Sequence, residues 1–434
     1  MRTRRVAVLG VLLAVSVGVL GGLAVTADDT AADDAVEAAD GRTLVTVQAY
    51  GWFGNHNGEV FVLDESGDRT WEYAPGDAAV FDGEPLDNGN VLVSFGQKVP
   101  DADCPERWAN TSGDHCVRNR VQEVDPDTGE VAWEYDWYDR QISYHEVHDA
   151  DRLASGETVV IDMGRHRAFT VARNGTVTWE WSAKENLDEG SDFWADHVEG
   201  TSREDHAYTG PRQDWTHMND VDRLENGNFL MSIRNFDVVV EVDPDTDDVV
   251  AVYGEPGDHS LMYEQHDPDY LEASDTLIVA DSENNRVVEY DAETMEEVWR
   301  YEGPSAGDRL QWPRDADRLP NGNTLIADSR NFRVLEVGPD GEVVWAHELT
   351  DERGIVYDAD RFGVGSEEPG EVPSGRELNG TAHGGTVGET LAVADSWVSF
   401  VLPPWVGVAG LLALLTGGGA LAGLAREGYR ARAG

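Results

Sequence analysis

The feature that most constrains the fold is a repeat in the middle of the chain. Two copies stand back to back between Thr216 and Glu302, THMNDVDRLENGNFLMSIRNFDVVVEVDPDTDDVVAVYG and QHDPDYLEASDTLIVADSENNRVVEYDAETMEEVWRYEG. Each copy has a histidine, an Asp-x-Asp-x-Leu segment and then three short apolar runs separated by turn residues. A fixed period of this kind indicates one structural unit per repeat, so it decides the architecture.

The repeat extends beyond these two copies. Six unit openings occur, at Gly83–Leu86 (degenerate), Asp149–Leu153, Asp220–Leu224, Asp267–Leu271, Asp315–Leu319 and Asp358–Phe362. Six unit endings are centred on Trp71, Trp133, Trp179, Val252, Trp299 and Trp345. The anchors Leu224, Leu271 and Leu319 are spaced by 47 and 48 residues. Four short strands per unit and six units predict an all-β, six-bladed β-propeller.

The two ends of the repeat array are offset from each other. The first ending precedes the first opening, and the last opening has no ending. We therefore expect the strand at Asp358 to close the ring by completing the blade begun at Leu44–Tyr73. A β-sandwich, the main alternative fold, explains neither the period nor the offset. Two longer units hold insertions, one with the cysteines and one at Lys184–Trp215, which are expected to shape one mouth of the propeller.

Both ends of the chain are apolar. Met1–Arg5 is basic and precedes the apolar run Val6–Val25, which predicts a signal peptide or an uncleaved signal-anchor helix. Trp397–Ala425 is a second apolar run, followed by arginines, and predicts a transmembrane helix. The positive-inside rule then places the propeller on the extracellular face of the cell membrane. The expected divisions are 1–27 signal segment, 28–43 acidic spacer, 44–362 propeller, 363–396 acidic stalk, 397–425 transmembrane helix and 426–434 basic cytoplasmic tail.

The net charge of the sequence argues against nucleic-acid partners and indicates a protein that works in concentrated salt. The net charge is −52, and only Lys98 and Lys184 are lysines. No basic face is available to neutralise phosphates, which argues against nucleic acid. A surface this acidic is typical of a halophilic protein, and in molar salt the Debye length of ~3 Å would let an anionic small substrate approach. The 14 Trp, 13 Tyr and 11 Phe are ample for a folded core.

The two cysteines lie close together in the sequence CPERWANTSGDHC. Outside the cell, Cys104 and Cys116 are expected to form a disulfide that closes this loop. A metal site needs more ligands than the loop supplies, and no metal is predicted.

The candidate site follows from the repeat itself, because the innermost strand of each blade lines the central channel. The position five residues before each anchor holds Phe81, His148, Asn219, His266, Arg314 and Tyr357. His217 and Trp312 lie two residues further upstream in their own blades, and Arg234 lies at the end of a second strand. Isolated histidines are most often structural, but three at equivalent or near-equivalent sites indicate chemistry. His166, His197, His206 and His259 fall in turns or insertions and are expected at the surface.

These segments carry a family resemblance. DWTHMNDVDRLENGNFLMSIRN, EQHDPDYLEASDTLIVAD and YHEVHDADRLASGETVVID resemble the blade openings of the arylsulfotransferase (aryl-sulfate sulfotransferase) family, in a membrane-anchored form of haloarchaeal type. The family is a six-bladed propeller that transfers a sulfuryl group from a phenolic sulfate ester to another phenol. It works through a sulfated histidine and needs no nucleotide cofactor. The resemblance covers about residues 44–362 and neither terminal apolar run.

The resemblance assigns roles to individual residues. It makes His266 the nucleophile, His217 and His148 further catalytic histidines, and Arg234 the sulfate-binding arginine. Arg314, Asn219 and Trp312 are expected to bind substrate. The chain departs from the family at Ala280–Glu283, where the family has Phe-Asp-Asn-Gly, and it lacks the family's large N-terminal domain.

The residue types suit this chemistry independently. Sulfuryl transfer resembles phosphoryl transfer, in which positioning and electrostatics dominate, and an arginine fork matches the oxygens. A neutral imidazole can hold the group covalently between two half-reactions. Two alternatives remain, a non-catalytic extracellular propeller that binds a ligand and a sulfate-ester hydrolase that uses the same histidine. A quinone-binding propeller is disfavoured, because it would require eight blades and the sequence has six repeat units.

Overall fold

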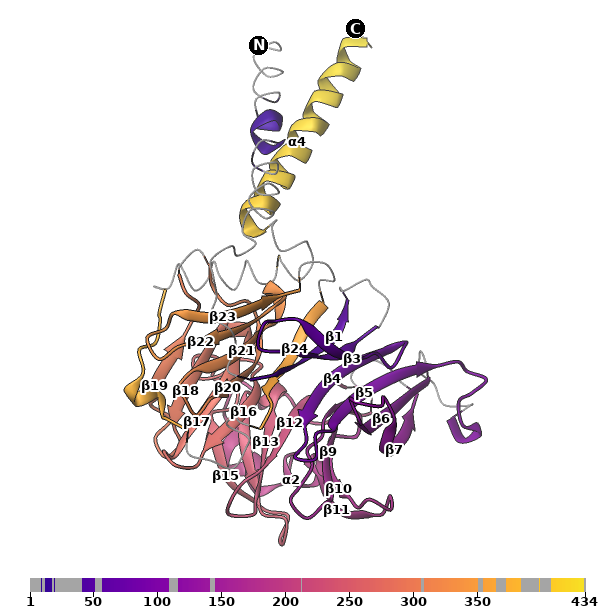
Figure 1. Ribbon diagram of the computed structural model, residues 1–434. Coiled ribbons are helices and arrows are strands. Elements are labelled where there is room, and N and C mark those ends of the chain that lie inside the picture. Colours follow the sequence, from indigo (N-terminus) through magenta and orange to yellow (C-terminus); the bar gives the residue numbers. More distant parts are fainter. Residues whose placement is uncertain are drawn as a thin grey trace. The chain divides into compact units, whose positions relative to one another are not determined.

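The computed structural model contains six four-stranded antiparallel sheets, which are the blades of a six-bladed propeller (Figure 1). The described residues are 9, 12–17, 19, 41–50, 57–108, 116–140, 145–211, 213–305, 308–349, 354–363, 372–383, 398 and 407–432. The chain divides into two compact units, Val36–His383 and the combined terminal segments Met1–Ala35 and Gly384–Gly434. Each unit is described by itself.

Each blade is a meander whose first-named strand lines the channel. Blade 1 contains β24 (Gly354–Arg361), β1 (Thr43–Tyr50), β2 (Glu59–Leu63) and β3 (Arg69–Tyr73). Blade 2 contains β4 (Ala78–Pro85), β5 (Val91–Val99), β6 (Cys116–Val124) and β7 (Val131–Asp139). Blade 3 contains β8 (Val147–Asp149), β9 (Thr158–Asp162), β10 (Arg167–Val171) and β11 (Val177–Ser182).

The remaining blades follow the same plan. Blade 4 contains β12 (Met218–Arg223), β13 (Phe229–Ile233), β14 (Val238–Val242) and β15 (Val249–Gly254). Blade 5 contains β16 (His266–Leu271), β17 (Thr276–Asp281), β18 (Arg286–Asp291) and β19 (Glu297–Tyr301). Blade 6 contains β20 (Pro313–Arg318), β21 (Thr324–Asp328), β22 (Arg333–Val337) and β23 (Val343–Glu348).

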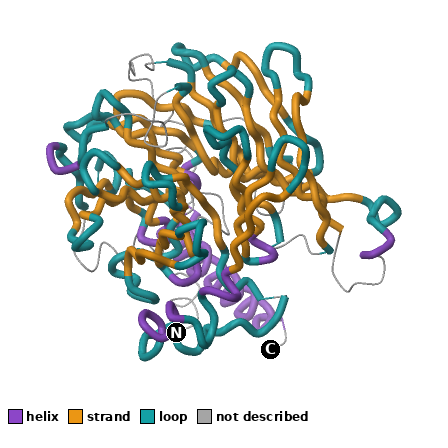
Figure 2. Tube along the Cα trace, turned by 90° about the horizontal axis from the view of Figure 1, so that it is seen from below, coloured by secondary structure: helices purple, strands orange, loops and turns teal. Residues whose placement is uncertain are grey.

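Short helical turns connect the strands, as the view turned by 90° shows (Figure 2). In blades 3 to 6, one 3₁₀ turn joins the second strand to the third: η2 (Met163–Arg165), η4 (Arg234–Phe236), η5 (Ser282–Asn284) and η6 (Ser329–Asn331). Each of these turns ends on a left-handed residue, which reverses the chain. The other helical segments are η1 (Glu106–Trp108), α2 (Ala183–Asn186), the π-helical η3 (Trp194–Val198) and η7 (Gly375–Glu377).

The predicted closure of the ring is confirmed. β24 pairs antiparallel with β1, Val45 opposite Ala359, so the last strand of the propeller and the first three form one sheet. The Cys104–Cys116 disulfide is also confirmed, with the two Cα atoms 6.0 Å apart. It ties the start of β6 to the loop after β5.

Apolar side chains fill the spaces between blades. Trp345 of blade 6 packs with Val45 and Phe61 of blade 1, and Trp133 of blade 2 packs with Phe169 of blade 3. Full burial of such a side chain stabilises the fold by roughly 1.5–3 kcal/mol. The tryptophans at the unit endings therefore join neighbouring blades.

The first Asp of the repeat opening bonds one blade to the next at five of the six blade interfaces. Its carboxylate accepts a hydrogen bond from a backbone N–H of the following channel strand at five blade interfaces: Ala150 to Asp82 (3.3 Å), Val221 to Asp149 (2.6 Å), Ala316 to Asp267 (3.4 Å), Ala359 to Asp315 (2.8 Å) and Gly83 to Asp358 (3.2 Å). A hydrogen bond of this kind contributes roughly 0.5–1.5 kcal/mol. The Asp-x-Asp pattern thus links the blades around the channel.

The segment after the propeller also contacts it. Residues 372–383, within the predicted stalk, lie against blade 5, where Gly375 donates its N–H to the Glu289 carboxylate (2.9 Å) and Thr381 forms a parallel bridge with Tyr301. A Cβ at Gly375 would approach the Trp299 Cβ to 2.3 Å, so this close contact requires glycine.

The terminal unit contains one long described helix, α4 (Gly407–Arg432). Val408–Arg426 is long and apolar enough to cross a membrane. The described part of the helix continues through most of the predicted basic tail, and most of the predicted start of the helix, from Trp397, lies outside the described residues. Most of the predicted N-terminal signal segment lies outside the described residues.

Buried carboxyl groups make the stability of the propeller depend on pH. Burial, with the nearby Asp267 carboxyl, raises the pKa of Asp149 to about 7. A carboxyl group whose folded pKa is raised stabilises the fold fully below its unfolded pKa, and this contribution is lost as pH rises through the folded value. We expect the melting temperature to rise by about 3 °C or more from pH 8 to pH 6, followed by circular dichroism.

The variant Asp149→Asn, which keeps an acceptor for the Val221 N–H, should reduce this pH dependence. The exposed Asp127→Asn should leave it unchanged. A pH dependence that is identical in the wild type and Asp149→Asn would show that surface charge alone is responsible.

Candidate functional site

A β-bulge presents the candidate residues to the channel. In five channel strands the ladder skips one residue, which turns its side chain out of the sheet: Phe81, His148, Asn219, Arg314 and Tyr357. These are the residues at the predicted repeat position. In blade 5 the skipped residue is Asp267 instead, and His266 is paired with Ala280.

The channel encloses about 430 Å³ of empty space, part of it open to solvent. The described residues lining it are Phe81, Asp82, Glu84, His148, Asp149, Asp151, Asn219, Asp220, His266, Asp267, Arg314, Asp315, Tyr357, Asp358 and Asp360. Histidine, arginine and aromatic side chains therefore share the channel with carboxylic acids. The His266 ring is 5.9 Å from Tyr357 and 6.4 Å from Trp312, between ring centres.

The hydrogen bonds of His266 fix its tautomer. Nδ1 is 2.8 Å from the Ser282 hydroxyl and 3.1 Å from the Glu264 carbonyl oxygen. The Ser282 hydroxyl donates its own hydrogen to the Pro313 carbonyl (2.7 Å), so both groups near Nδ1 act as acceptors. Nδ1 must carry the proton, and the lone pair is on Nε2. This is the form in which an imidazole is a nucleophile.

Backbone strain is concentrated on both sides of His266. Glu264 and Asp267 have φ angles of 50° and 46°, in the left-handed region that costs an ordinary residue about 1–2 kcal/mol. Strain of this kind persists where the surroundings impose it, and it is common at functional sites.

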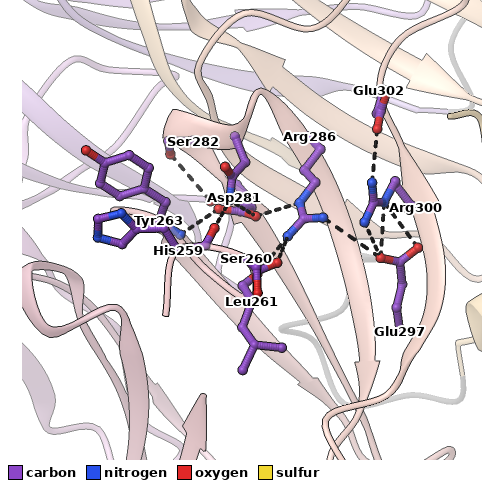
Figure 3. A network of polar contacts seen from close by, with 12 residues as sticks. His259, Ser260, Leu261, Tyr263, Asp281, Ser282, Arg286, Glu297, Arg300 and Glu302 are labelled. Carbon is purple, nitrogen blue, oxygen red and sulfur yellow. Dashed lines mark hydrogen bonds and ion pairs between the residues drawn. The ribbon is translucent and has the colours of Figure 1, made fainter. Parts of the chain in front are cut away.

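A polar network anchors the loop that leads into His266 (Figure 3). Asp281 accepts the Tyr263 N–H (2.8 Å) and pairs with Arg286 (2.6 Å). Arg286 also donates to the carbonyl oxygens of Ser260 (2.9 Å) and Leu261 (2.8 Å). Since Asp281 and Arg286 are buried in blade 5, they attach the loop to the rigid part of the blade.

The other two histidines lie close to each other. The rings of His148 and His217 are 5.2 Å apart, and His148 also stacks on Phe81 at 4.3 Å. His217 Nδ1 is 2.8 Å from both carboxylate oxygens of Asp214, which fixes the proton on Nδ1. This pair resembles the Asp–His half of a hydrolase triad, in which the carboxylate orients the ring and stabilises its charged form.

The two predicted arginines have different surroundings. Arg234 forms an ion pair with Glu264 and does not line the channel. Arg314 lines the channel, donates to the neutral Gln48 (2.8 Å), and lies over the rings of Trp312 (4.0 Å) and Tyr357 (4.5 Å). Arg314 is thus a buried cation with no carboxylate among its hydrogen-bond partners in the described chain, which favours an anionic ligand.

The positive groups hold the histidines neutral. Burial lowers the pKa of His266 well below its ordinary value, and Arg314 and Arg234 lower it further. Burial and the neighbouring His217 do the same for His148. For His217, burial and Arg234 lower the pKa against the opposing effect of Asp214. All three can therefore act as bases or nucleophiles in neutral solution.

Several polar atoms in the channel have no partner among the described residues. They are His148 Nδ1, Asn219 Oδ1, Asp220 Oδ2, Arg314 Nε and Tyr357 Oη, each on a residue more than nine-tenths buried. Buried polar groups are normally hydrogen-bonded, so this set indicates a site for a small polar ligand. No group of three or more His, Cys, Asp or Glu in the described chain is arranged to hold a metal ion.

The structure thus brings His148, Asn219, His266 and Arg314 to the channel, with His217 and Trp312 in contact with them. Arg330, which sequence reasoning missed, lies over the same Trp312 ring at 3.9 Å. The sequence feature that could have identified Arg330 is the tripeptide Ser-Arg-Asn at Ser329–Asn331. It resembles the Ile-Arg-Asn of blade 4 but is displaced by one residue relative to the repeat. Glu264 and Asp214 were missed too, because residues that form ion pairs across loops do not recur at a fixed position of the repeat.

One expectation about the remaining histidines is wrong. His197 and His259 are exposed and His206 is half-buried, but His166 is only 2% exposed and bonds the Thr216 hydroxyl (2.9 Å). It occupies the left-handed end of η2, and its ring packs against Trp215.

Comparison with known families agrees with this geometry. A sequence model of the arylsulfotransferase (ASST) family matches residues 168–350, which include blades 4 to 6 and three of the four predicted catalytic residues. The match supports assignment of this region to the arylsulfotransferase family. A model of the outer membrane protein assembly factor BamB matches residues 16–199. No curated protein matches the chain.

Solved structures show the fold alone. A protein of unknown function from Bacteroides caccae is 15% identical, with 74% of this chain and 98% of that chain covered and a TM-score of 0.50. The periplasmic gluconolactonase of Pseudomonas aeruginosa is 15% identical, with 76% and 88% covered and a TM-score of 0.43. Virginiamycin B lyase of Staphylococcus aureus is 8% identical, with 74% and 90% covered and a TM-score of 0.42.

The tautomer of His266 can be tested directly. In a protein labelled with ¹⁵N-histidine, we expect the His266 ring to show the neutral, Nδ1-protonated form at pH 6.5 and below, because burial and two arginines oppose its protonation. Ser282→Ala should shift the His266 nitrogen signals, since it removes one acceptor of the Nδ1–H. An Nε2-protonated ring, or a charged ring at neutral pH, would contradict the assignment.

Proposed function

We propose that the protein is an aryl-sulfate sulfotransferase, in which His266 carries the sulfuryl group between a phenolic sulfate ester and a phenolic acceptor. The observation that carries the proposal is the His266 ring, held with its Nδ1 proton on two acceptors and its Nε2 lone pair available beside the buried Arg314. The family match over blades 4 to 6 supports it.

In the first half-reaction the Nε2 lone pair of His266 forms the N–S bond while the S–O bond to the aryl group breaks. The phenolate leaves and takes a proton from solvent, because His217 is neutral and its Nδ1–H stays on Asp214. The positive charge of the sulfated ring is stabilised through Nδ1–H by the Glu264 carbonyl. Arg314 and Arg234 supply the positive field for the sulfuryl oxygens.

The second half-reaction is the reverse with another phenol. The acceptor gives its proton to neutral His217, its oxygen forms the new S–O bond, and the N–S bond breaks. His266 returns to its neutral form, and His217 releases to solvent the proton that it received, so the two half-reactions balance. His148, whose ring centre is 5.2 Å from that of His217, stacks on Phe81 and lines the channel beside the group that takes the proton.

The setting of the enzyme completes the proposal. Helix α4 anchors the chain in the cell membrane, the basic residues flanking the two apolar ends place the propeller on the extracellular face, and the acidic surface suits concentrated salt. The partners are a small aryl sulfate and a phenol, with no cofactor. Non-catalytic binding and sulfate-ester hydrolysis are the rival functions.

The test uses the purified full-length chain in detergent and high salt, with p-nitrophenyl sulfate as donor and phenol as acceptor. We expect nitrophenol release that depends on phenol, together with a sulfated peptide containing His266. His266→Ala should lower the rate at least about a thousandfold, as expected for loss of a covalent nucleophile. The exposed His259→Ala is the matched control and should retain activity.

Three other outcomes separate the rivals. Release without phenol would indicate a hydrolase, and saturable binding of p-nitrophenyl sulfate without turnover would indicate a binding propeller. Unchanged turnover in His266→Ala would contradict the assigned nucleophile.

The pH dependence follows from the lowered pKa of His266. Since the ring stays neutral well below pH 6.5, the formation of sulfated His266 from p-nitrophenyl sulfate should not slow between pH 8 and pH 6.5. It should slow only at more acidic pH. Rapid-quench measurement of the sulfated enzyme across this range checks the expectation, and a decline centred at pH 6.5 would show an unperturbed histidine.

A further inference from the structure

One of the six blade interfaces lacks the hydrogen bond between a backbone N–H and the carboxyl group of the preceding channel strand. At the interface of blades 4 and 5, the residue equivalent to Ala150, Val221, Ala316, Ala359 and Gly83 is Pro268, which has no N–H. Asp220, the carboxyl group that should accept there, is 6% exposed, and its Oδ2 has no partner among the described residues. Blades 4 and 5 are those that carry His217 and His266.

The residue before Asp220 in the sequence offers a second, uncharged acceptor. Asn219 donates its amide N–H to the Gln265 carbonyl (2.9 Å), which leaves Oδ1 facing no donor in the described chain. Asn219 is 4% exposed and lines the same channel as Asp220. Two buried oxygens on adjacent residues that line the channel therefore lack a donor in the described chain, and a protein normally satisfies such atoms with water or an ion.

The charge around these oxygens decides between water and an ion. Nine of the described side chains that line the channel are carboxylic acids, and Arg314 is the one arginine or lysine among them. Carboxylates gathered in a buried channel repel one another, and a cation relieves that repulsion. An all-oxygen site selects a hard cation such as Mg²⁺ or Ca²⁺ over transition metals.

The geometry distinguishes between these two ions. Ca²⁺ takes six to eight oxygen ligands, whereas Mg²⁺ keeps several waters and is usually held by one or two carboxylates. No three acidic or histidine ligands of the described chain are arranged to hold an ion directly. The channel offers about 30 Å³ to water-sized molecules, which is room for a small ion with about one or two waters.

We propose that the channel binds a hydrated Mg²⁺ ion at the break between blades 4 and 5, held by the Asp220 carboxylate and the Asn219 carbonyl oxygen. The ion takes the place of the missing hydrogen bond as the partner of Asp220, on blade 4 at its interface with blade 5. The inference does not depend on the sulfotransferase activity.

The test compares thermal unfolding of the full-length chain in detergent with MgCl₂ and with KCl at equal, high ionic strength. We expect a saturable rise in melting temperature with Mg²⁺, whose midpoint gives an apparent Kd. Asp220→Asn should weaken that Kd at least tenfold. The exposed Asp127→Asn is the matched control and should leave it unchanged.

Pro268→Ala gives a sharper result, because it supplies the absent N–H. This variant should be more stable than the wild type without Mg²⁺ and should lose at least tenfold in Mg²⁺ affinity. A wild type with no response specific to Mg²⁺, a stronger response to CaCl₂, or an unchanged Kd in both Asp220→Asn and Pro268→Ala would each overturn the proposal.

Discussion

The hydrogen bond from one channel strand to the first Asp of the preceding one is the interaction on which the ring depends. A propeller blade is a small sheet that cannot bury its own faces, so its stability comes from its neighbours. Apolar packing, as at Trp345 and Trp133, fills the space between blades but does not fix how far one blade slides along the next. The Asp-to-backbone bond does, because a hydrogen bond has a narrow range of length and angle.

Fixing the blades in register has a direct effect on the site. The bulge lies next to the bonded Asp, as His148 precedes Asp149 and Arg314 precedes Asp315. A side chain turned out of a strand is placed as accurately as the strand itself. Bulged side chains from five separate sheets therefore meet in one channel, and the same motif provides both the joint and the functional position.

The sequence was sufficient for the architecture because the repeat is periodic. It predicted the six blades, the closure by the strand at Asp358 and the disulfide. It also predicted that His148, Asn219, His266 and Arg314 face one place, since all four occupy the same repeat position. Periodicity gives no information about side chains that meet across loops. The Asp214–His217 pair, the Arg234–Glu264 pair and Arg330 over Trp312 were therefore visible only in the structure.

Local departures from the repeat could not be predicted from the sequence either. The bulge in blade 5 is shifted from His266 to Asp267, which is left-handed, and an aspartate is not a residue that a pattern would flag. The burial of His166 was missed for a related reason. A histidine in a turn is expected in water, but here the insertion that ends at Trp215 covers it.

The segment at residues 372–383 has a mechanical consequence for a chain whose last long helix can be held in a membrane. Strand β24 closes the ring, and it is also the last strand before the chain leaves the propeller. Force applied along the chain from the C-terminal side reaches the contacts of Gly375 with Glu289 and of Thr381 with Tyr301 before it reaches β24. The contacts with blade 5 thus bear this force first, so that less of it reaches the closing strand β24.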